Sequence, residues 1–142
     1  MKKKLLLVED CDSLRRVMGS ILSANYTVLG AKNGLNALGV LSRGEIPDLI
    51  VTDADMPELD GVALMQHLQC SGMYAHIPVL VLGEHSVAHG EVYYKNMGAK
   101  GFLPKPLNLK DFEEKILKIA GTYSSWEPSE LLADTASNVV FG

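Results

Sequence analysis

The chain has 142 residues, enough for one domain with a substantial hydrophobic core. Hydrophobic residues make up 47% and charged residues 21%, which is the composition of a soluble globular protein. The net charge of −4 gives no support for direct nucleic-acid binding by this domain. No apolar segment is long enough for a signal-peptide core or a bilayer span, so we expect a cytoplasmic protein without membrane contact.

Apolar runs of strand length alternate with segments of helical periodicity along most of the chain. The predicted strands are residues 4–8, 26–31, 49–52, 77–82 and 100–103. The predicted helices are residues 12–24, a segment from Asn33-Gly34 to about 44, a segment capped by Asp60, residues 86–97 and a segment starting at 108. This alternation predicts an α/β fold, in which a doubly wound five-stranded parallel sheet carries helices on both faces.

Polar residues mark the starts of two of these helices. Asp60 precedes the third predicted helix and is a favourable N-cap residue. Asn108 has Asp111 three residues further on, a spacing similar to a capping box. The segment 86–97 is the least regular of the helices, because Gly90 lies inside it and glycine lowers helix propensity.

The composition changes after about residue 121, where Ser124-Ser125-Trp126-Glu127-Pro128 follows the last predicted helix. We expect residues 1–121 to form the domain and residues 122–142 to be a linker or docking tail. The apolar ending, residues 139–142, suggests that the tail leads to an output domain outside this sequence.

The two cysteines, Cys11 and Cys70, fit neither a zinc-ligand spacing nor a disulfide framework. We therefore expect two free thiols, each buried or half-buried.

Charged residues directly follow three of the predicted strands. Glu9 and Asp10 follow the first strand, Asp53 follows the third and Lys105 follows the fifth. Open α/β sheets bind ligands at the edge where parallel strands end, so these side chains are expected to converge there. Clustered carboxylates repel one another unless a cation neutralises them, and oxygen ligands without thiols suit Mg²⁺. The pattern predicts a Mg²⁺ site and phosphoryl chemistry on an aspartate.

Taken together, the motifs resemble those of the receiver domain of two-component response regulators. The matching segments are Glu9-Asp10, Asn33-Gly34, Asp53 through Met56-Pro57 to Asp60-Gly61, Gly98-Ala99 and Lys105-Pro106. The resemblance covers residues 3 to about 121 and implies a flavodoxin-like fold of the receiver type. It also implies a cis peptide bond between Lys105 and Pro106.

The resemblance implies a role for each charged residue. Asp53 would accept a phosphoryl group from a phosphohistidine on a sensor histidine kinase or a phosphotransfer protein. Glu9, Asp10 and Asp53 would hold Mg²⁺ together with the backbone carbonyl of Asp55. Lys105 would pair with a phosphoryl oxygen. Such a domain is a signalling switch and not an enzyme.

The sequence departs from the family pattern at the end of the fourth strand. Receivers normally carry a small hydroxyl residue and then a small residue there, whereas this chain has Gly83 and Glu84. Phe102 stands where the family has an aromatic residue that rotates in step with the hydroxyl. We expect Asp53 to be phosphorylated still, with weak or rewired coupling to the face made by the fourth helix, fifth strand and fifth helix. The same face is where the family resemblance allows a homodimer.

One alternative is a degenerate receiver that acts as an interaction module independent of phosphorylation. Gly83 and Glu84 favour this alternative. The presence of Asp53, Lys105 and the acidic pair at residues 9–10 argues against it.

A second alternative is an enzyme, because Asp53-Ala54-Asp55 resembles the Asp-x-Asp motif of haloacid-dehalogenase-like phosphatases. That family places the motif on its first strand and needs further acidic residues late in a longer chain. Here a full βαβα unit precedes the motif and no acidic pair follows the fifth strand, so we do not expect an enzyme.

Overall fold

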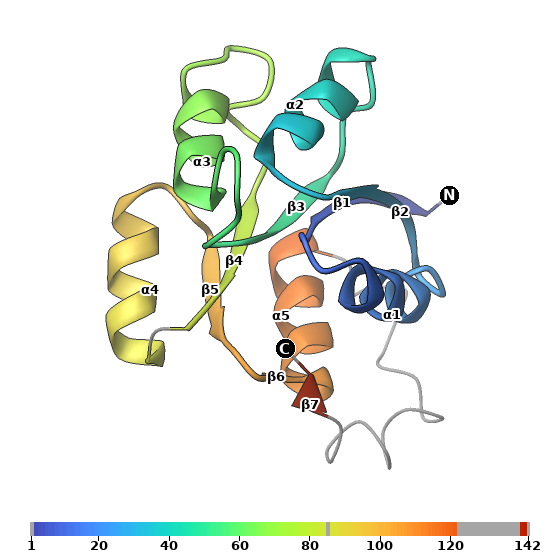
Figure 1. Cartoon of the computed structure of the whole chain (residues 1–142), viewed down its shortest axis with the longest axis vertical. Helices are drawn as coiled ribbons and strands as arrows, with labels where there is room; N and C mark the ends of the chain where they lie inside the picture. Colours follow the sequence, from blue (N-terminus) through green and yellow to red (C-terminus); the bar gives the residue numbers. More distant parts are fainter. Residues whose placement is uncertain (1, 85, 122–139, 142) are drawn as a thin grey trace.

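The computed structural model describes residues 2–84, 86–121 and 140–141 (Figure 1). The strands are β1 (Lys3–Val8), β2 (Tyr26–Ala31), β3 (Leu49–Asp53), β4 (Val79–Gly83), β5 (Gly101–Pro104), β6 (Leu107–Asn108) and β7 (Val140–Phe141). The helices are α1 (Asp12–Leu22), α2 (Gly34–Ser42), α3 (Gly61–Gln69), α4 (Val87–Asn96) and α5 (Leu109–Ala120). None of the helices in these ranges combines the length and hydropathy needed to cross a bilayer.

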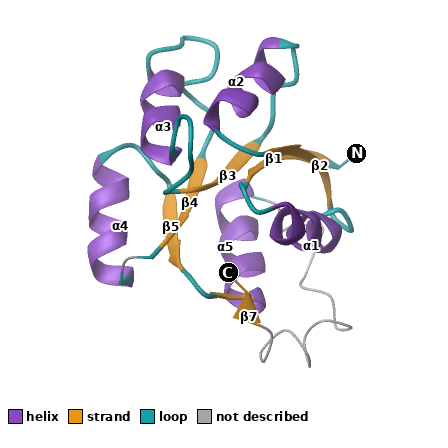
Figure 2. Ribbon diagram, viewed as in Figure 1, coloured by secondary structure: helices purple, strands orange, loops and turns teal. Residues whose placement is uncertain are grey.

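The first five strands form one parallel sheet in the order β2-β1-β3-β4-β5. Helices α1 and α5 cover one face of the sheet, and α2, α3 and α4 cover the other (Figures 1 and 2). The predicted doubly wound α/β fold is therefore confirmed.

Each face of the sheet packs its own hydrophobic core, because successive residues of a strand point to opposite faces. On β1, Leu5 and Leu7 join the core under α1 and α5. Leu6 and Val8 join the core under α2, α3 and α4. All four side chains are at most 1% exposed, so β1 is buried on both faces, as its continuous apolar run predicts.

The predicted helix caps are present. The Asp60 carboxylate accepts a hydrogen bond from the backbone N–H of Ala63 at 2.9 Å. The Asn108 side chain accepts one from the backbone N–H of Asp111 at 3.2 Å. Both bonds satisfy amide groups that have no partner inside the first turn of a helix.

Helix α4 forms in spite of Gly90, and the structure gives a reason for that glycine. Gly90 is buried against the ring of Phe102 on β5, and an ideal Cβ at residue 90 would lie 2.4 Å from that ring. Only a residue without a side chain allows α4 to approach β5 this closely. The glycine that lowers the helix propensity of this segment is therefore what permits its packing.

Some boundaries of strands and helices differ from the predicted ones. Strand β4 begins two residues later than predicted, and α1 ends at Leu22, with Ser23 as its C-cap. The short antiparallel pair of β6 and β7 was not predicted. The expected linker or docking tail falls largely on residues 122–139 and 142, which lie outside the described residues.

The expectation of buried or half-buried thiols was wrong, since Cys11 and Cys70 are both free and exposed. Cys11 is the N-cap of α1 and Cys70 is the C-cap of α3. Both residues therefore lie at helix ends and not on the helix faces that pack against the sheet.

Substituting Gly90 with alanine is expected to destabilise the domain by about 1–3 kcal/mol, because the new methyl group has no space beside Phe102. Gly39 on α2 is the matched control, since no atom lies within 4 Å of its ideal Cβ. Gly39→Ala should stabilise the domain by about 0.5–1 kcal/mol through helix propensity. The free energy of unfolding in urea measures both variants. A Gly90→Ala variant as stable as Gly39→Ala would contradict the close packing described above.

Candidate functional site

The strand registers bring three charged residues to one edge of the sheet. Val8 on β1 pairs with Thr52 on β3, so Glu9 and Asp53, each one residue further along, emerge side by side. The backbone N–H of Lys105 donates to the carbonyl of Gly83 at 2.7 Å, which fixes the lysine beside the end of β4. The bond between Lys105 and Pro106 is cis, as expected.

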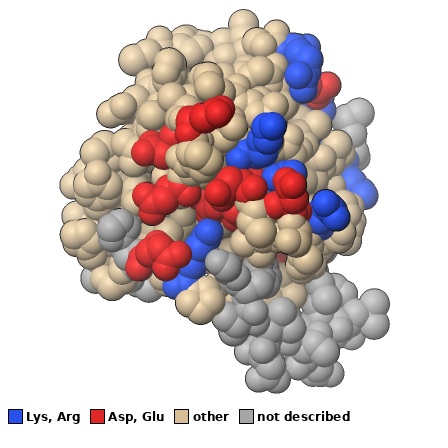
Figure 3. Space-filling model, in the orientation of Figure 1, with Lys and Arg blue, Asp and Glu red and all other residues tan. Residues whose placement is uncertain are grey.

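Three carboxylates converge at this edge. Glu9, Asp10 and Asp53 each present an oxygen, and these oxygens all lie within 4.8 Å of one another. Glu9 and Asp53 are each 2% exposed, whereas Asp10 is exposed. Acidic side chains gather in the middle of the face that contains this edge (Figure 3). The structure thus brings together the three acidic side chains that were predicted to meet.

Lys105 is the cation inside this cluster. Its Nζ lies 2.6 Å from Asp53 Oδ1 and 3.6 Å from Glu9 Oε1. Despite these ion pairs, both carboxylate oxygens are buried without a hydrogen bond in the described part of the chain. Buried polar atoms normally have partners. One ammonium group against three carboxylates leaves an excess of negative charge, and the oxygen donors fit a hard divalent cation.

Burial and mutual proximity shift the ionisation of these groups. Burial, followed by the close side chain of Asp53, raises the pKa of Glu9 to about 8. Burial also raises the pKa of Asp53, although its contacts with Glu9 and Lys105 act in the opposite direction. Burial would lower the pKa of Lys105, but the contacts with Asp53 and Glu9 outweigh it and raise this pKa. Without a metal ion, both carboxyls therefore keep their protons to a higher pH than isolated carboxyls do, and the lysine stays charged.

Glu9 is held in place by its neighbours on α1. The backbone N–H of Cys11 donates to Glu9 Oε2 at 3.1 Å. Arg15 donates from Nη1 to the carbonyl oxygen of Glu9 at 2.7 Å, and its other nitrogen Nη2 pairs with Asp12 at 2.6 Å. Arg15 was not predicted to belong to the site. The three-residue spacing of Asp12 and Arg15 on a helix could have indicated their ion pair. The hydrogen bond to Glu9 could not be predicted, because it depends on the path of the turn between β1 and α1.

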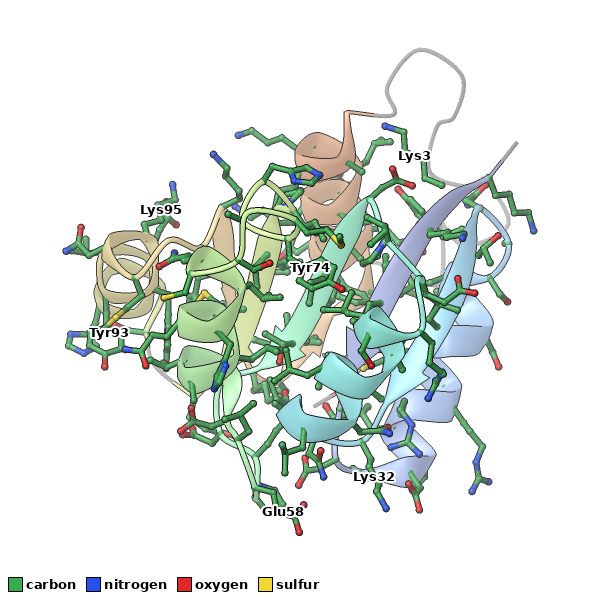
Figure 4. All side chains as sticks on the ribbon, turned by 90° about the horizontal axis from the view of Figure 1, so that it is seen from above. Lys3, Lys32, Glu58, Tyr74, Tyr93 and Lys95 are labelled. Atoms are coloured by element: carbon green, nitrogen blue, oxygen red, sulfur yellow. The ribbon has the colours of Figure 1, made fainter. Side chains whose placement is uncertain are left out.

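The loop after β3 is fixed against the start of α2. The N–H of Gly34 donates to the carbonyl of Leu59 at 3.0 Å, and a Cβ at residue 34 would lie 2.3 Å from that oxygen. Glu58 and Leu59 both adopt left-handed backbone conformations, with φ of 54° and 71°. Glu58 lies at the outer tip of this loop, and Lys3 lies toward the opposite edge of the sheet (Figure 4). The Asn33-Gly34 motif therefore positions the loop that carries Asp55.

The side chain of Asp55 is exposed and does not belong to the carboxylate cluster. Its predicted role uses the backbone carbonyl and stays a prediction. Glu84 is also exposed.

The space beside Gly83 is occupied by an aromatic ring. An ideal Cβ at residue 83 would lie 3.2 Å from the ring of Phe102 and 3.3 Å from the Cβ of Ala54. Phe102 is 1% exposed, and its ring stacks on Tyr94 with a centroid distance of 5.3 Å and an interplanar angle of 15°. The ring is thus enclosed by two glycines, Gly83 and Gly90, and by Tyr94.

Comparison with known proteins agrees with this geometry. Residues 5–117 match the family model of the response regulator receiver domain. A histidine kinase P4 of Formosa agariphila is 34% identical over 83% of this chain, and a probable transcriptional regulator ycf27 of Porphyridium aerugineum is 32% identical over 83%. The chain spans 8% and 48% of the lengths of these two proteins.

Shorter relatives are covered almost completely. The chemotaxis protein CheY-3 of Vibrio cholerae is 30% identical over 82% of this chain and 90% of its own length. The solved structure of the chemotaxis response regulator CheY4 of Vibrio cholerae superposes with a TM-score of 0.76 at 27% identity, covering 84% of this chain and 99% of that one. The family match and these relatives show that the chain belongs to the response regulator receiver domain family.

Proposed function

We propose that this receiver domain accepts a phosphoryl group on Asp53 from a phosphohistidine of a sensor histidine kinase or a phosphotransfer protein. The observation that carries the proposal is the cluster of Glu9, Asp10 and Asp53, whose oxygens lie within 4.8 Å of one another beside Lys105. A cytoplasmic location is part of this proposal.

Mg²⁺ is the proposed cofactor. Glu9, Asp10 and Asp53 would hold it, with the backbone carbonyl of Asp55 as a further ligand. The fit rests on the oxygen-only donor set and on the buried atoms Glu9 Oε1 and Asp53 Oδ1, which accept no hydrogen bond within the described ranges. When bound, Mg²⁺ supplies positive charge that offsets the repulsion between a carboxylate and a phosphoryl group.

The chain's own residues prepare Asp53 for this reaction. The end of β3 fixes the carboxylate, which is the attacking nucleophile. Any proton held by Asp53 or Glu9 has to leave before both carboxylates can bind Mg²⁺. Lys105, 2.6 Å from Asp53 Oδ1, would exchange its ion pair with the carboxylate for one with a phosphoryl oxygen. Arg15 and the N–H of Cys11 keep Glu9 in place throughout.

We propose further that phosphorylation has little effect on the face of α4, β5 and α5. Gly83 has no hydroxyl to bond a phosphoryl oxygen, and Phe102 is already enclosed between Gly83, Gly90 and Tyr94. The same observation favours the second candidate function, an interaction module that does not depend on phosphorylation. In either case this face is available for a homodimer or another partner.

Incubation with Mg²⁺ and acetyl phosphate is expected to add one phosphoryl group to the parent protein and none to Asp53→Asn. Intact-mass spectrometry measures the increment, and omission of Mg²⁺ should abolish it. Mg²⁺ binding without an increment would favour the phosphorylation-independent module. If Mg²⁺ does not bind, the assignment of the acidic cluster is wrong.

The metal-free domain is expected to lose stability as the pH rises from about 4.5 to about 8. The pKa of Glu9 is raised from 4.5 to about 8 and that of Asp53 is raised from 3.8, so the folded state binds more protons than the unfolded state in this window. The shift of the Glu9 pKa alone sets an upper limit of about 5 kcal/mol for this contribution, and partial solvent screening of the cluster makes the loss smaller. Unfolding in urea with EDTA at several pH values measures it.

Mg²⁺ should restore more stability at pH 8 than at pH 5, because protons compete with the metal for the carboxylates.

Glu113 on α5 is also buried, which raises its pKa and adds to the pH dependence of the metal-free domain with the same sign. Asp53→Asn should flatten the pH dependence only in part, because it removes the Asp53 carboxyl and its effect on Glu9 but leaves Glu9 and Glu113 buried. A pH profile that Asp53→Asn leaves unchanged would contradict the raised pKa of Asp53.

Amide hydrogen exchange is expected to change on phosphorylation near the loop after β3 and at Lys105, and to stay nearly constant in α4 and β5. The reason is the fixed position of Phe102. Mass spectrometry of peptides from the parent and from Asp53→Asn, both treated with acetyl phosphate, provides the comparison. Strong protection changes in α4 would show that the signal reaches this face in spite of Gly83.

A further inference from the structure

An open cleft of about 480 Å³ lies between the start of α3 and the side of α4. It adjoins the acidic site but is lined by other side chains. One wall contains Asp55 from the loop after β3, Asp60 at the N-cap of α3 and Gln66 on α3. The other wall contains His89, Tyr93 and Tyr94, all on α4. Its volume lies within the range of ligand-binding pockets, about 300–1,000 Å³.

The α4 wall is aromatic, and its rings pack against a buried ring of β5. His89 and Tyr93 lie one helical turn apart, and their rings are nearly parallel, at 6° with centroids 6.4 Å apart. Tyr93 contacts Tyr94 edge to face at 4.9 Å, and Tyr94 stacks on the buried ring of Phe102. Because Tyr93 contacts Tyr94 and Tyr94 contacts Phe102, the ring of Tyr93 is packed against the hydrophobic core.

The opposite wall is acidic. Asp55 is exposed, and Asp60 uses one carboxylate oxygen to cap α3. No lysine or arginine is among the residues that line the cleft in the described part of the chain. Burial and then the charges of Asp55 and Asp60, with Tyr93, raise the pKa of Tyr94, as expected where the electrostatic potential is negative. The cleft therefore pairs negative charge with aromatic ring faces.

We propose that this cleft binds an arginine side chain of a partner protein, with the guanidinium group between the carboxylates of Asp55 and Asp60 and the ring of Tyr93. A guanidinium group is planar, so it can stack on an aromatic ring while it donates two hydrogen bonds to a carboxylate. An ammonium group is more strongly hydrated and cannot make this bidentate contact. The proposal goes beyond phosphoryl acceptance and does not depend on it.

The exposed surface of α4 indicates that the arginine comes from a protein. Tyr93, which lines the cleft, is 42% exposed, and Val92, its neighbour in the sequence, is 63% exposed. Apolar and aromatic residues next to a charged pocket are typical of protein interfaces, where anchors fill pockets and neighbouring contacts exclude water. A small free cation would leave these side chains uncovered.

The test titrates the full ¹⁵N-labelled chain with N-acetyl-arginine amide and follows backbone amide shifts by NMR. Saturable shifts are expected at residues 55, 63, 66 and 93. The lysine analogue should bind at least threefold more weakly, and the uncharged citrulline analogue should not bind. Absence of saturable shifts at the cleft would overturn the proposal, as would equal binding of the citrulline analogue.

Variants locate the contact. Asp55→Asn and Tyr93→Leu should each weaken binding at least fivefold, whereas Tyr93→Phe should retain it because the ring remains. Glu114→Gln on α5 is the control for loss of an exposed carboxylate elsewhere, and it should bind as the parent does. The spectra report whether each variant is folded. Unchanged affinity in folded Asp55→Asn and Tyr93→Leu would overturn the assignment.

A second probe tests the protein origin of the arginine. The capped peptide Leu-Arg-Leu should bind at least fivefold more tightly than capped arginine alone, because its leucines can cover Val92 and Tyr93. Equal affinities would show a site for a small cation only and would overturn the docking proposal.

Discussion

The functional edge of this domain depends on the repulsion between two buried carboxylates. The parallel registers of β1 and β3 leave Glu9 and Asp53 little freedom to separate, since both side chains emerge from adjacent strand ends. Lys105 neutralises part of the charge, and the raised pKa values of both carboxyls show that protons are held more tightly here than on isolated carboxyls. The proposed Mg²⁺ would supply the remaining positive charge. The chemistry proposed for Asp53 is thus a consequence of an electrostatic conflict that the fold maintains.

Much of the fold was predictable because local patterns and the final structure agree. Continuous apolar runs predicted β1 and β3, and helical spacing with Asp60 and Asn108 as caps predicted α3 and α5. The meeting of Glu9, Asp10 and Asp53 followed from their common position at strand ends. Each of these inferences uses residues close together in sequence or one general property of parallel sheets.

The remaining features depend on contacts between distant segments, which local patterns do not contain. The pairing of β6 with β7 involves two residues on each strand, too few to show a period. The exposure of Cys11 and Cys70 depends on where helices end relative to the sheet. Gly34 and Gly90 were visible in the sequence, but their partners Leu59 and Phe102 are known only from the structure.

The enclosure of Phe102 also couples three positions of the chain through one side chain. A serine or threonine at residue 83 would place its Cβ 3.2 Å from this ring, closer than side chains usually pack, so the ring would have to move by a few tenths of an ångström. Gly90 and Tyr94, which pack against the same ring, limit that movement. A smaller residue at 102 would relieve the contact, but it would leave a cavity against Gly90 and Tyr94. The effect of a hydroxyl residue at 83 therefore depends on how freely the ring of Phe102 can turn.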